Sequence, residues 1–453
     1  MQPFHYHVFI CDQKKPEGVP CCPARGSAQT INALRKEVAA RGLLDEVQIT
    51  TCGSLGLCER GPNLVVYPEG VWYSGVRPED VRELVESHFI KGQPVERLAN
   101  RDQAALRAEI LSNRAKFMAA QRAKETSGVL PDDLNQTLRG YMESRALLTA
   151  LELDIFTAVG GGATAEEVAQ KISTHTRATE MLLNALAAMG MLAKQRGVFR
   201  NTPTTARYFA AGSEDNARAG LIHTANIWHR WSNLTECVRA GTAVGHQEMA
   251  ARGDDWTEPF ITAMHRNAAE RAPLVVQAVG AAADERLLDV GGGSAAYSIA
   301  FAQAHEKLHA TVLDLPTVLP IAQRHINAAG LAGRVETIAG DLRHDALGKG
   351  FTLVLASAIC HMLSPEENQY LLRRCFAALD PNGRVVIQDF ILEPDKAAPK
   401  QAALFALNML VGTPAGSTYS YEEYSAWLQE AGFQEVRHIR LPGPSSLMVG
   451  AKK

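Results

Sequence analysis

Several features are missing from this chain of 453 residues, and each absence excludes a class of protein. No stretch approaches 18 uncharged apolar residues, so we expect no membrane-spanning segment. No basic segment followed by a long apolar run stands at the start, so we expect a cytoplasmic protein without a secretory signal. Lys and Arg (46) nearly balance Asp and Glu (49), and this net charge of −3 provides no electrostatic basis for binding nucleic acid. No internal repeat is present, which excludes repeat architectures.

Cysteine is scarce outside the N-terminal region. Five of the eight cysteines occur by position 58, namely Cys11, Cys21, Cys22, Cys52 and Cys58. A secreted disulfide scaffold would distribute its cysteines through a small domain, so the clustering favours metal ligation or redox chemistry. Zinc-type ligand pairs, a C-x-x-C dithiol and the C-x3-C-x2-C triplet of radical enzymes are absent from this cluster.

Residues 1–92 are predicted to form a small α/β domain. The expected order is a strand, a helix, a second strand, a hairpin and a closing helix, which is the order of a thioredoxin-like fold. The segment resembles the thioredoxin-like [2Fe–2S] ferredoxins through HVFIC at 7–11, CPARGS at 22–27 and TCGSLGLCERGPNLVVYPEGVWYSGV at 51–76. The resemblance implies a [2Fe–2S] cluster.

The same resemblance implies which cysteines bind the cluster. Cys11, Cys22 and Cys58 stand at family ligand positions. Many members carry the remaining ligand four residues before the last one, where this chain has Ser54, so Cys52 is assigned instead. Whether Cys21 or Cys22 is the ligand remains open.

The middle of the chain is predicted to be mostly helical. Residues 93–128 are expected to form a helical linker. Residues 129–265 combine helices with a small β-wing near 190–200, which is typical of a winged helix. The helix expected to recognise DNA in such a fold, RATEMLLNALAAMGML, carries few basic residues, so protein–protein packing is favoured over DNA binding.

From residue 266 to 453 the pattern indicates a doubly wound parallel sheet. Short apolar strands alternate with helical segments from about Arg286, and a C-terminal hairpin is expected at the sheet edge. The segment Asp289-Val290-Gly291-Gly292-Gly293-Ser294 follows one strand and opens a helix, which is typical of a loop that binds a cofactor carboxylate or phosphate. Asp314 and Asp341 end the next two strands, where acids can bind ribose and base.

These motifs resemble the small-molecule O-methyltransferases that include caffeate and acetylserotonin enzymes. LLDVGGGSAAYS, VLDLP, AGDL and AICHML occur in the family order, and the resemblance covers about residues 135–453. It implies binding of S-adenosylmethionine and a homodimer built by the winged-helix region. The implied cofactor residues are Asp289, Gly291, Gly293, Asp314, Leu315, Asp341, Leu342 and Ser357. Ala295 replaces the usual third glycine.

The resemblance also implies a catalytic base, His361. The Asp that follows this His in the family is Met362 here, so Glu366 or Glu367 is a candidate partner for the imidazole. The implied substrate pocket contains Trp231, Met264, His265, Asn408 and Met409. A hydroxyl substrate needs a group that accepts its proton, whereas a thiol or enol would need no strong base.

We therefore predict a methyltransferase that acts on a small aromatic or conjugated hydroxyl compound. The [2Fe–2S] domain would deliver electrons or control the redox state, with a redox partner protein as donor or acceptor. Two alternatives remain open at this point: a redox enzyme that uses S-adenosylmethionine as a non-donating ligand, and a redox sensor or carrier. Transfer to O, S, N or C is not distinguished.

Overall fold

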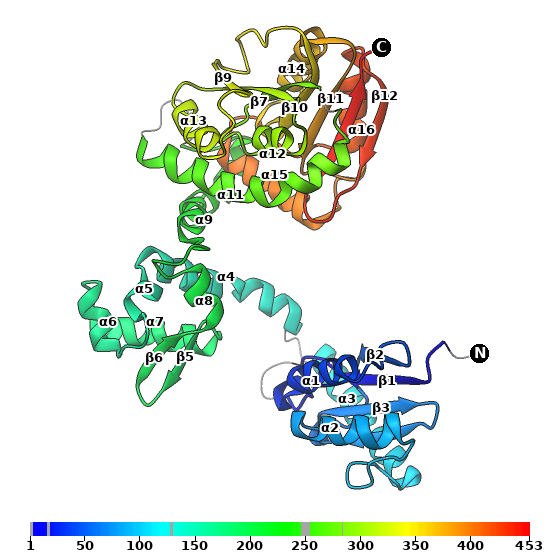
Figure 1. Ribbon diagram of the computed structural model, residues 1–453. Coiled ribbons are helices and arrows are strands. Elements are labelled where there is room, and N and C mark those ends of the chain that lie inside the picture. The colour runs from blue at the N-terminus through cyan, green and yellow to red at the C-terminus, as the bar shows by residue number, and fades with distance from the viewer. Residues whose placement is uncertain (1–2, 16–18, 127–129, 246–253, 283) are drawn as a thin grey trace. The chain divides into compact units, whose positions relative to one another are not determined.

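The structure is a computed structural model that describes residues 3–15, 19–126, 130–245, 254–282 and 284–453 (Figure 1). Its contacts divide the chain into two units, Met1–Tyr141 and Met142–Lys453, and each is described by itself. Among the described residues, no helix is long and apolar enough to cross a bilayer.

The first unit contains a four-stranded sheet in the order β2-β1-β3-β4. β1 and β2 are parallel, and β3 is antiparallel to both β1 and β4. In chain order the elements are β1 (Tyr6–Cys11), α1 (Ser27–Ala40), β2 (Val47–Cys52), β3 (Asn63–Tyr67), β4 (Val71–Ser74), α2 (Val81–Leu84), η4 (Val85–Ile90) and α3 (Gln103–Thr126). This is the strand, helix, strand, hairpin, helix order predicted from the sequence.

The second unit begins with a helical region. Helix α4 (Asp132–Glu152) runs from the first unit into it. The elements that follow are α5 (Ile155–Val159), α6 (Ala165–Lys171), α7 (Thr176–Ala188), β5 (Leu192–Gln195), β6 (Val198–Asn201), α8 (Pro203–Tyr208), α9 (Arg218–Trp231), α10 (Leu234–Ala240) and α11 (Asp254–Val279). β5 and β6 form the predicted antiparallel wing after helix α7.

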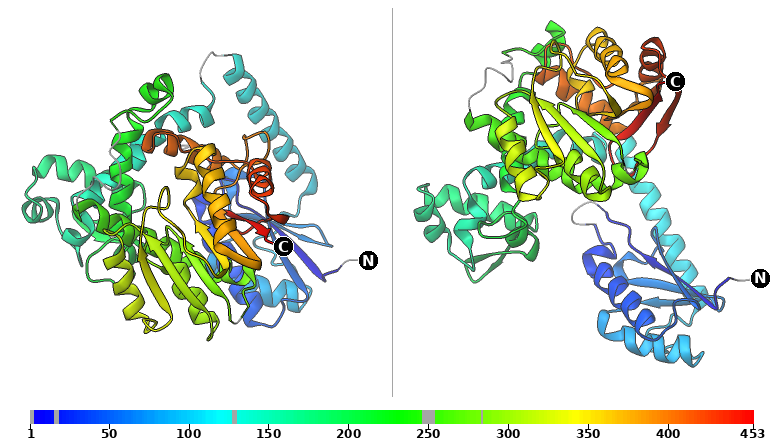
Figure 2. Two further views of the ribbon diagram at one scale, coloured as in Figure 1. Left: turned by 90° about the horizontal axis from the view of Figure 1, so that it is seen from above. Right: turned by 45° about the horizontal axis from the view of Figure 1, so that its top comes forward.

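A seven-stranded sheet in the order β12-β13-β11-β10-β7-β8-β9 forms the rest of the second unit (Figure 2). Strands β7 to β11 are parallel, and β13 is antiparallel to both β11 and β12, as the sequence predicts. Its elements are β7 (Arg286–Val290), α12 (Ala296–Ala304), β8 (His309–Asp314), α13 (Leu319–Ala328), β9 (Val335–Ala339), β10 (Phe351–Ser357), α14 (Pro365–Ala378), β11 (Leu379–Asp389), α15 (Lys400–Gly412), α16 (Tyr421–Glu430), β12 (Gln434–Ile439) and β13 (Ser446–Ala451).

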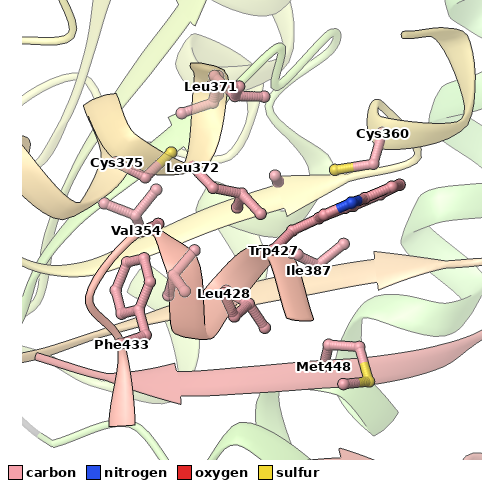
Figure 3. Packing of buried hydrophobic residues seen from close by; sticks show 14 of the residues in the cluster. Val354, Cys360, Leu371, Leu372, Cys375, Ile387, Trp427, Leu428, Phe433 and Met448 are labelled. Atoms are coloured by element: carbon pink, nitrogen blue, oxygen red, sulfur yellow. The ribbon is translucent and has the colours of Figure 1, made fainter. Parts of the chain in front are cut away.

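Alternate residues of the central strand β10 face two different cores. Val354 and Ala356 pack with residues of α14 and α16, whereas Leu353 and Leu355 pack with residues of α11, α12 and α13. This alternation follows from the two-residue period of a strand and covers both faces of the sheet with helices. Figure 3 shows the first core, in which Trp427 and Leu428 of α16 lie near Cys360 and Cys375.

Candidate functional site

The glycine-rich loop lies between β7 and α12. Gly291 and Gly293 adopt left-handed φ angles of +66° and +56°, which a glycine adopts without strain. A Cβ on Gly291 would lie 2.5 Å from Ile359 Cδ1, and a Cβ on Gly292 would lie 2.8 Å from Asp289 Cγ. Only glycine allows the backbone to run this close to its neighbours. The loop therefore forms a cradle at the start of α12, where backbone N–H groups favour a carboxylate.

Two acids support this loop, Asp289, which is fully buried, and Asp314, which is partly buried. Asp314 Oδ2 accepts a hydrogen bond from Gly293 N at 2.7 Å, and its Oδ1 accepts one from Leu315 N at 2.7 Å. Asp289 Oδ2 accepts a hydrogen bond from Ser298 Oγ at 2.8 Å, while its Oδ1 is buried without a partner. Burial raises the pKa of both carboxyls, that of Asp289 to about 6. The narrow cradle and the unpartnered buried acceptor fit a ligand that carries hydrogen-bond donors, as S-adenosylmethionine does.

Ala295, the N-cap residue of α12, stands where the resemblance predicts a third glycine. It keeps a left-handed φ of +65° and is fully buried at the start of α12. The replacement of the usual glycine therefore preserves the backbone conformation, although an alanine adopts it less readily.

The other predicted cofactor residues lie around the same sheet edge. Leu342 Cδ2 would lie 3.2 Å from a Cβ on Gly291, so Leu342 forms part of the cradle wall. Asp341 Oδ1 accepts a hydrogen bond from Arg343 N at 2.9 Å. Ser357 Oγ donates to Gln388 Oε1 at 2.5 Å. Direct contacts of these residues with a cofactor remain predictions.

His265 contacts the glycine-rich loop as well as the region predicted for substrate. Its Nδ1 lies 2.8 Å from Ser294 Oγ. Its ring stacks on that of His325 with centroids 3.7 Å apart and an interplanar angle of 13°. Burial, followed by the neighbouring His325, lowers the pKa of His265 to about 4. The pair is therefore neutral at physiological pH, and His265 links α11 to the loop.

His361 forms a buried pair with a carboxylate that the sequence analysis did not identify. His361 Nδ1 lies 2.6 Å from Asp389 Oδ1, and His361 N donates to Asp389 Oδ2 at 3.0 Å. Phe390 N also donates to Asp389 Oδ1 at 2.8 Å. The exposed fractions of His361 and Asp389 are only 6% and 1%. With Nδ1 directed at Asp389, Nε2 is the imidazole atom left to accept a proton.

The partners suggested for His361 from the sequence are wrong. Glu367 accepts a hydrogen bond from Ser364 N at 2.7 Å as part of the capping box of α14. Glu366 accepts one from Ser364 Oγ at 2.9 Å. Both carboxylates accept hydrogen bonds from Ser364 at the start of α14, where acidic residues of the first turn commonly bind free donor groups.

Helices α9, α11 and α15 contribute the residues predicted for the substrate pocket. Trp231 Nε1 donates to Asn408 Oδ1 at 3.0 Å and so joins the two helices. Phe405 of α15 was not predicted, yet its ring contacts that of His361 edge-on, with centroids 4.9 Å apart. Met409 is buried, and Met264 is partly buried. An apolar, aromatic surface thus borders the His361 imidazole.

The cysteines of the first unit gather at one end of its sheet. Cys11 ends β1 and lies opposite Cys52 in the parallel register. A hydrogen bond with Cys22 lowers the pKa of Cys11 to about 6, and the same bond raises the pKa of Cys22. Asn63 Nδ2 also donates to Cys22 Sγ at 3.5 Å. Within the ranges that the structure describes, however, no group of three or more His, Cys, Asp or Glu side chains is arranged to hold a metal ion.

Helix α3 packs on the loop that carries Cys58. Asn113 Nδ2 donates to Gly56 O at 2.9 Å, and a Cβ on Gly56 would lie 3.0 Å from Ile110 Cγ2. Near the same loop, Lys15 Nζ donates to Cys58 Sγ at 3.0 Å and lies 5.7 Å from the centre of the Phe117 ring. Helix α3 and Lys15 therefore both contact the loop and side chain of Cys58.

Comparisons with known families match two regions of the chain. Residues 231–434 match the O-methyltransferase domain, and residues 135–211 match the O-methyltransferase dimerisation domain. The helical region with its wing and the seven-stranded sheet thus correspond to two recognised domains.

Individual proteins of known name or structure also match this chain. The 3-hydroxy-5-methyl-1-naphthoate 3-O-methyltransferase of Streptomyces sahachiroi is 34% identical over 331 residues, which cover 71% of this chain and 95% of that protein. The solved structure of PigF with SAH is 26% identical, covers 72% of this chain and all of that chain, and has a TM-score of 0.65. Human N-acetylserotonin methyltransferase with SAM, at 22% identity and a TM-score of 0.64, covers 72% of this chain and 99% of its own and shares the fold.

Proposed function

This chain belongs to the O-methyltransferase family, and we propose that it transfers a methyl group from S-adenosylmethionine to a hydroxyl group of a small aromatic compound. The pair formed by His361 and Asp389 supports this proposal most directly. It provides a positioned base at an apolar surface, at the same edge of the sheet as the glycine-rich loop.

In the proposed reaction, the chain's residues orient the substrate and remove one proton. When bound, S-adenosylmethionine supplies an electrophilic methyl group on a positively charged sulfur. His361 Nε2 accepts the hydroxyl proton while the oxygen forms its bond to the methyl carbon and the C–S bond breaks. Asp389 keeps the imidazole in the tautomer with the proton on Nδ1 and stabilises the imidazolium that forms. The products are a methyl ether and S-adenosylhomocysteine.

An aromatic substrate is proposed from the walls of the site. The rings of Phe390 and Phe405 stack with centroids 4.0 Å apart, and both rings lie beside His361. Such a surface favours a flat ring through stacking and edge-to-face contacts. The name of the 34% identical relative specifies a hydroxynaphthoate as its substrate, which agrees with this class.

The test measures S-adenosylhomocysteine formation with a panel of hydroxylated naphthalenes and benzenes. For any substrate that is turned over, His361→Gln is expected to lower kcat about 10²–10⁴-fold because a general base contributes that much. Binding of S-adenosylmethionine, followed by calorimetry, should stay unchanged. Glu366→Gln is the matched control. An active His361→Gln enzyme would show that another group accepts the proton.

The non-donating use of S-adenosylmethionine is less well supported. That alternative depended on the attached cluster and on the missing acid after His361, where Met362 stands. Asp389 supplies an acid from the neighbouring strand instead, which removes the second of these two grounds.

For residues 1–92 we propose a thioredoxin-like [2Fe–2S] domain with Cys11, Cys22, Cys52 and Cys58 as ligands. No three of these side chains are arranged as a metal site among the described residues, so the proposal rests on their positions in the sequence and on the lowered pKa of Cys11. Cys22, which contacts Cys11 and Asn63, is a better ligand candidate than Cys21. When bound, the cluster supplies one-electron transfer, and we propose exchange with a redox partner protein.

Anaerobic purification with iron and sulfide analysis and EPR spectroscopy tests this assignment. Cys22→Ser and Cys58→Ser should each lose the two-iron signal, and Cys21→Ser should retain it. Absence of iron and sulfide from the anaerobic wild-type protein would contradict the cluster proposal and leave the methyltransferase proposal unaffected. Comparison of Cys58→Ser with wild type in oxidised and reduced buffers then tests whether the cluster controls methylation.

The domain division remains part of the proposal. We divide the chain into the ferredoxin domain 1–92, a linker 93–128, the dimerisation and substrate-wall domain 129–265 and the methyltransferase domain 266–453. The family match over residues 135–211 supports a homodimer.

A further inference from the structure

Helices α1 and α2 pack on one face of the N-terminal sheet, in the core of the first unit. Residues of α1 pack with the even-numbered residues of β1 and β3, such as Val8 and Leu64. The odd-numbered residues Phe9 and Val65 point to the opposite face, because successive side chains of a strand alternate. That opposite face is concave.

The concavity is a cavity of about 600 Å³. It lies within the size range of small-molecule sites, about 300–1,000 Å³. The residues that line it come from the open sheet face, the cysteine loop and the segment before β1: Pro3, Phe4, His7, Phe9, Cys52, Leu55, Val65, Tyr67 and Trp72. Because Pro3 and Phe4 add a wall from outside the sheet, the surface differs from a flat sheet face.

The arrangement of side chains across the sheet defines the shape of this cavity. Phe9 lies opposite Val65, and Val65 lies opposite Trp72, in the strand register. A short aliphatic side chain therefore lies between two large rings. Val65 is only 2% exposed, so its neighbours close over it, and the row presents Phe9 and Trp72 as an aromatic floor on which a flat ring can lie.

The residues that line the cavity also indicate the polarity of the molecule that would bind there. The lining residues that the structure describes include no Asp, Glu, Lys or Arg. The imidazole of His7 is held by Thr50, with Nε2 2.7 Å from Oγ1, and stacks on Phe9 with centroids 4.2 Å apart. Tyr67 meets Phe9 edge-on at 6.0 Å. Ordered rings without a nearby charge favour an uncharged aromatic molecule over an ionic one.

We infer that this cavity is a binding site for a flat, uncharged aromatic molecule, separate from the site at His361. The cavity includes Cys52 in its wall, so the bound ring lies beside the cysteine loop. The inference goes beyond the proposed methyl transfer and does not depend on it.

The test uses the full chain with 5-fluorotryptophan at its five tryptophans and 1-naphthol as the probe. 1-Naphthol has no electrophilic centre for the thiols. The ¹⁹F resonance that disappears in Trp72→Phe identifies Trp72. We expect this resonance to shift with 1-naphthol to saturation, with and without S-adenosylmethionine present.

Two variants examine the ring contacts. Phe9→Ala should weaken the binding reported by Trp72 about 3–10-fold, the effect of losing one aromatic pair. Tyr67→Leu, at a ring 46% exposed and thus of little weight for folding, should weaken it similarly. The control is Tyr370→Ala on α14, whose ring is 47% exposed.

Two outcomes would overturn the inference. In one, 1-naphthol shifts the resonances of Trp228 or Trp231 while Trp72 stays unchanged, so that it binds at the methyltransferase site alone. In the other, the Trp72 resonance depends on protein concentration and not on 1-naphthol, so that a second copy of the chain covers the face. Neither outcome bears on methyl transfer.

Discussion

At the scale of single residues, the chemistry depends on how a few buried polar groups are paired. Asp389 accepts hydrogen bonds from two backbone N–H groups and contacts His361 Nδ1, all away from water. A carboxylate held by this many donors keeps a fixed position and orients the imidazole. Its removal therefore frees the His361 ring to change its orientation and tautomer.

The first prediction concerns this carboxylate. Asp389→Asn should lower kcat about 10²–10⁴-fold, because the amide can select the wrong imidazole tautomer and cannot stabilise its charge. The KM for S-adenosylmethionine should change little. Asp389→Glu should recover part of the activity. If Asp389→Asn and Asp389→Glu lose the same amount of kcat and both have a lower melting temperature, the role of Asp389 is purely structural.

The second prediction concerns His265. Burial lowers its pKa from 6.5 to about 4, so the folded state resists protonation that the unfolded state accepts. Its contribution to stability is therefore complete above pH 6.5 and declines as the pH falls from 6.5 towards 4. After allowance for solvent screening, the decline between pH 6.5 and pH 5 should be about 1 kcal/mol.

Urea unfolding at pH 7 and pH 5 measures this effect. The His265→Gln variant should lose about 1 kcal/mol less than wild type over this interval. His309→Gln, at an exposed position on β8, is the control and should behave as wild type. Identical pH dependence in His265→Gln and wild type would rule out His265 as the responsible group.

At the scale of secondary structure elements, helix α3 packs on the cysteine loop although it lies outside both family matches. The sequence predicts it only as a linker. In the structure, Ile110 and Asn113 pack on the turn at Gly56, and Glu109 pairs with Arg60 at 2.9 Å. The helix therefore braces the loop between Cys52 and Cys58.

The third prediction follows from this packing. Ile110→Asp places a charge against the turn at Gly56 and should loosen the loop, because an unpaired charge is costly at a packed contact. Amide hydrogen exchange of residues 53–60 should accelerate at least several-fold. Leu111→Asp is the matched control, since the neighbouring Leu111 is 43% exposed on the same helix. Equal exchange in the two variants would contradict the bracing role.

The elements also show which features a sequence can predict. The buried strands were recognised because runs such as Leu353–Ala356 are apolar and are flanked by polar residues or glycine. The glycine-rich loop was recognised because its residues are contiguous. Asp389 was missed because it lies 28 residues from His361 and approaches it only through the pairing of β10 with β11. Phe405 was missed because an aromatic residue in a helix usually signals core packing.

At the scale of the whole molecule, helix α4 carries an apolar surface that is exposed in the single chain. Leu134, Leu138 and Tyr141 follow helical spacing and are 44%, 56% and 59% exposed. A stripe of this kind is unfavourable in water and is typical of an interface. The dimerisation-domain match begins at residue 135, within this helix. We therefore expect a second copy of the chain to cover the stripe.

The fourth prediction is that the double variant Leu134→Glu/Leu138→Glu dissociates the dimer. Introducing like charges on both copies opposes association through burial of unpaired carboxylates, which costs several kcal/mol in a two-fold interface. Light scattering after size-exclusion chromatography should give about 98 kDa for wild type, twice the chain mass of 49.1 kDa, and about half of that for the variant. Tyr370→Glu, at a 47% exposed position on α14 outside the dimerisation-domain match, is the control and should remain dimeric. A double variant that retains the dimer mass would place the interface elsewhere, whereas a monomeric variant with an unchanged melting temperature would identify α4 as an interface helix.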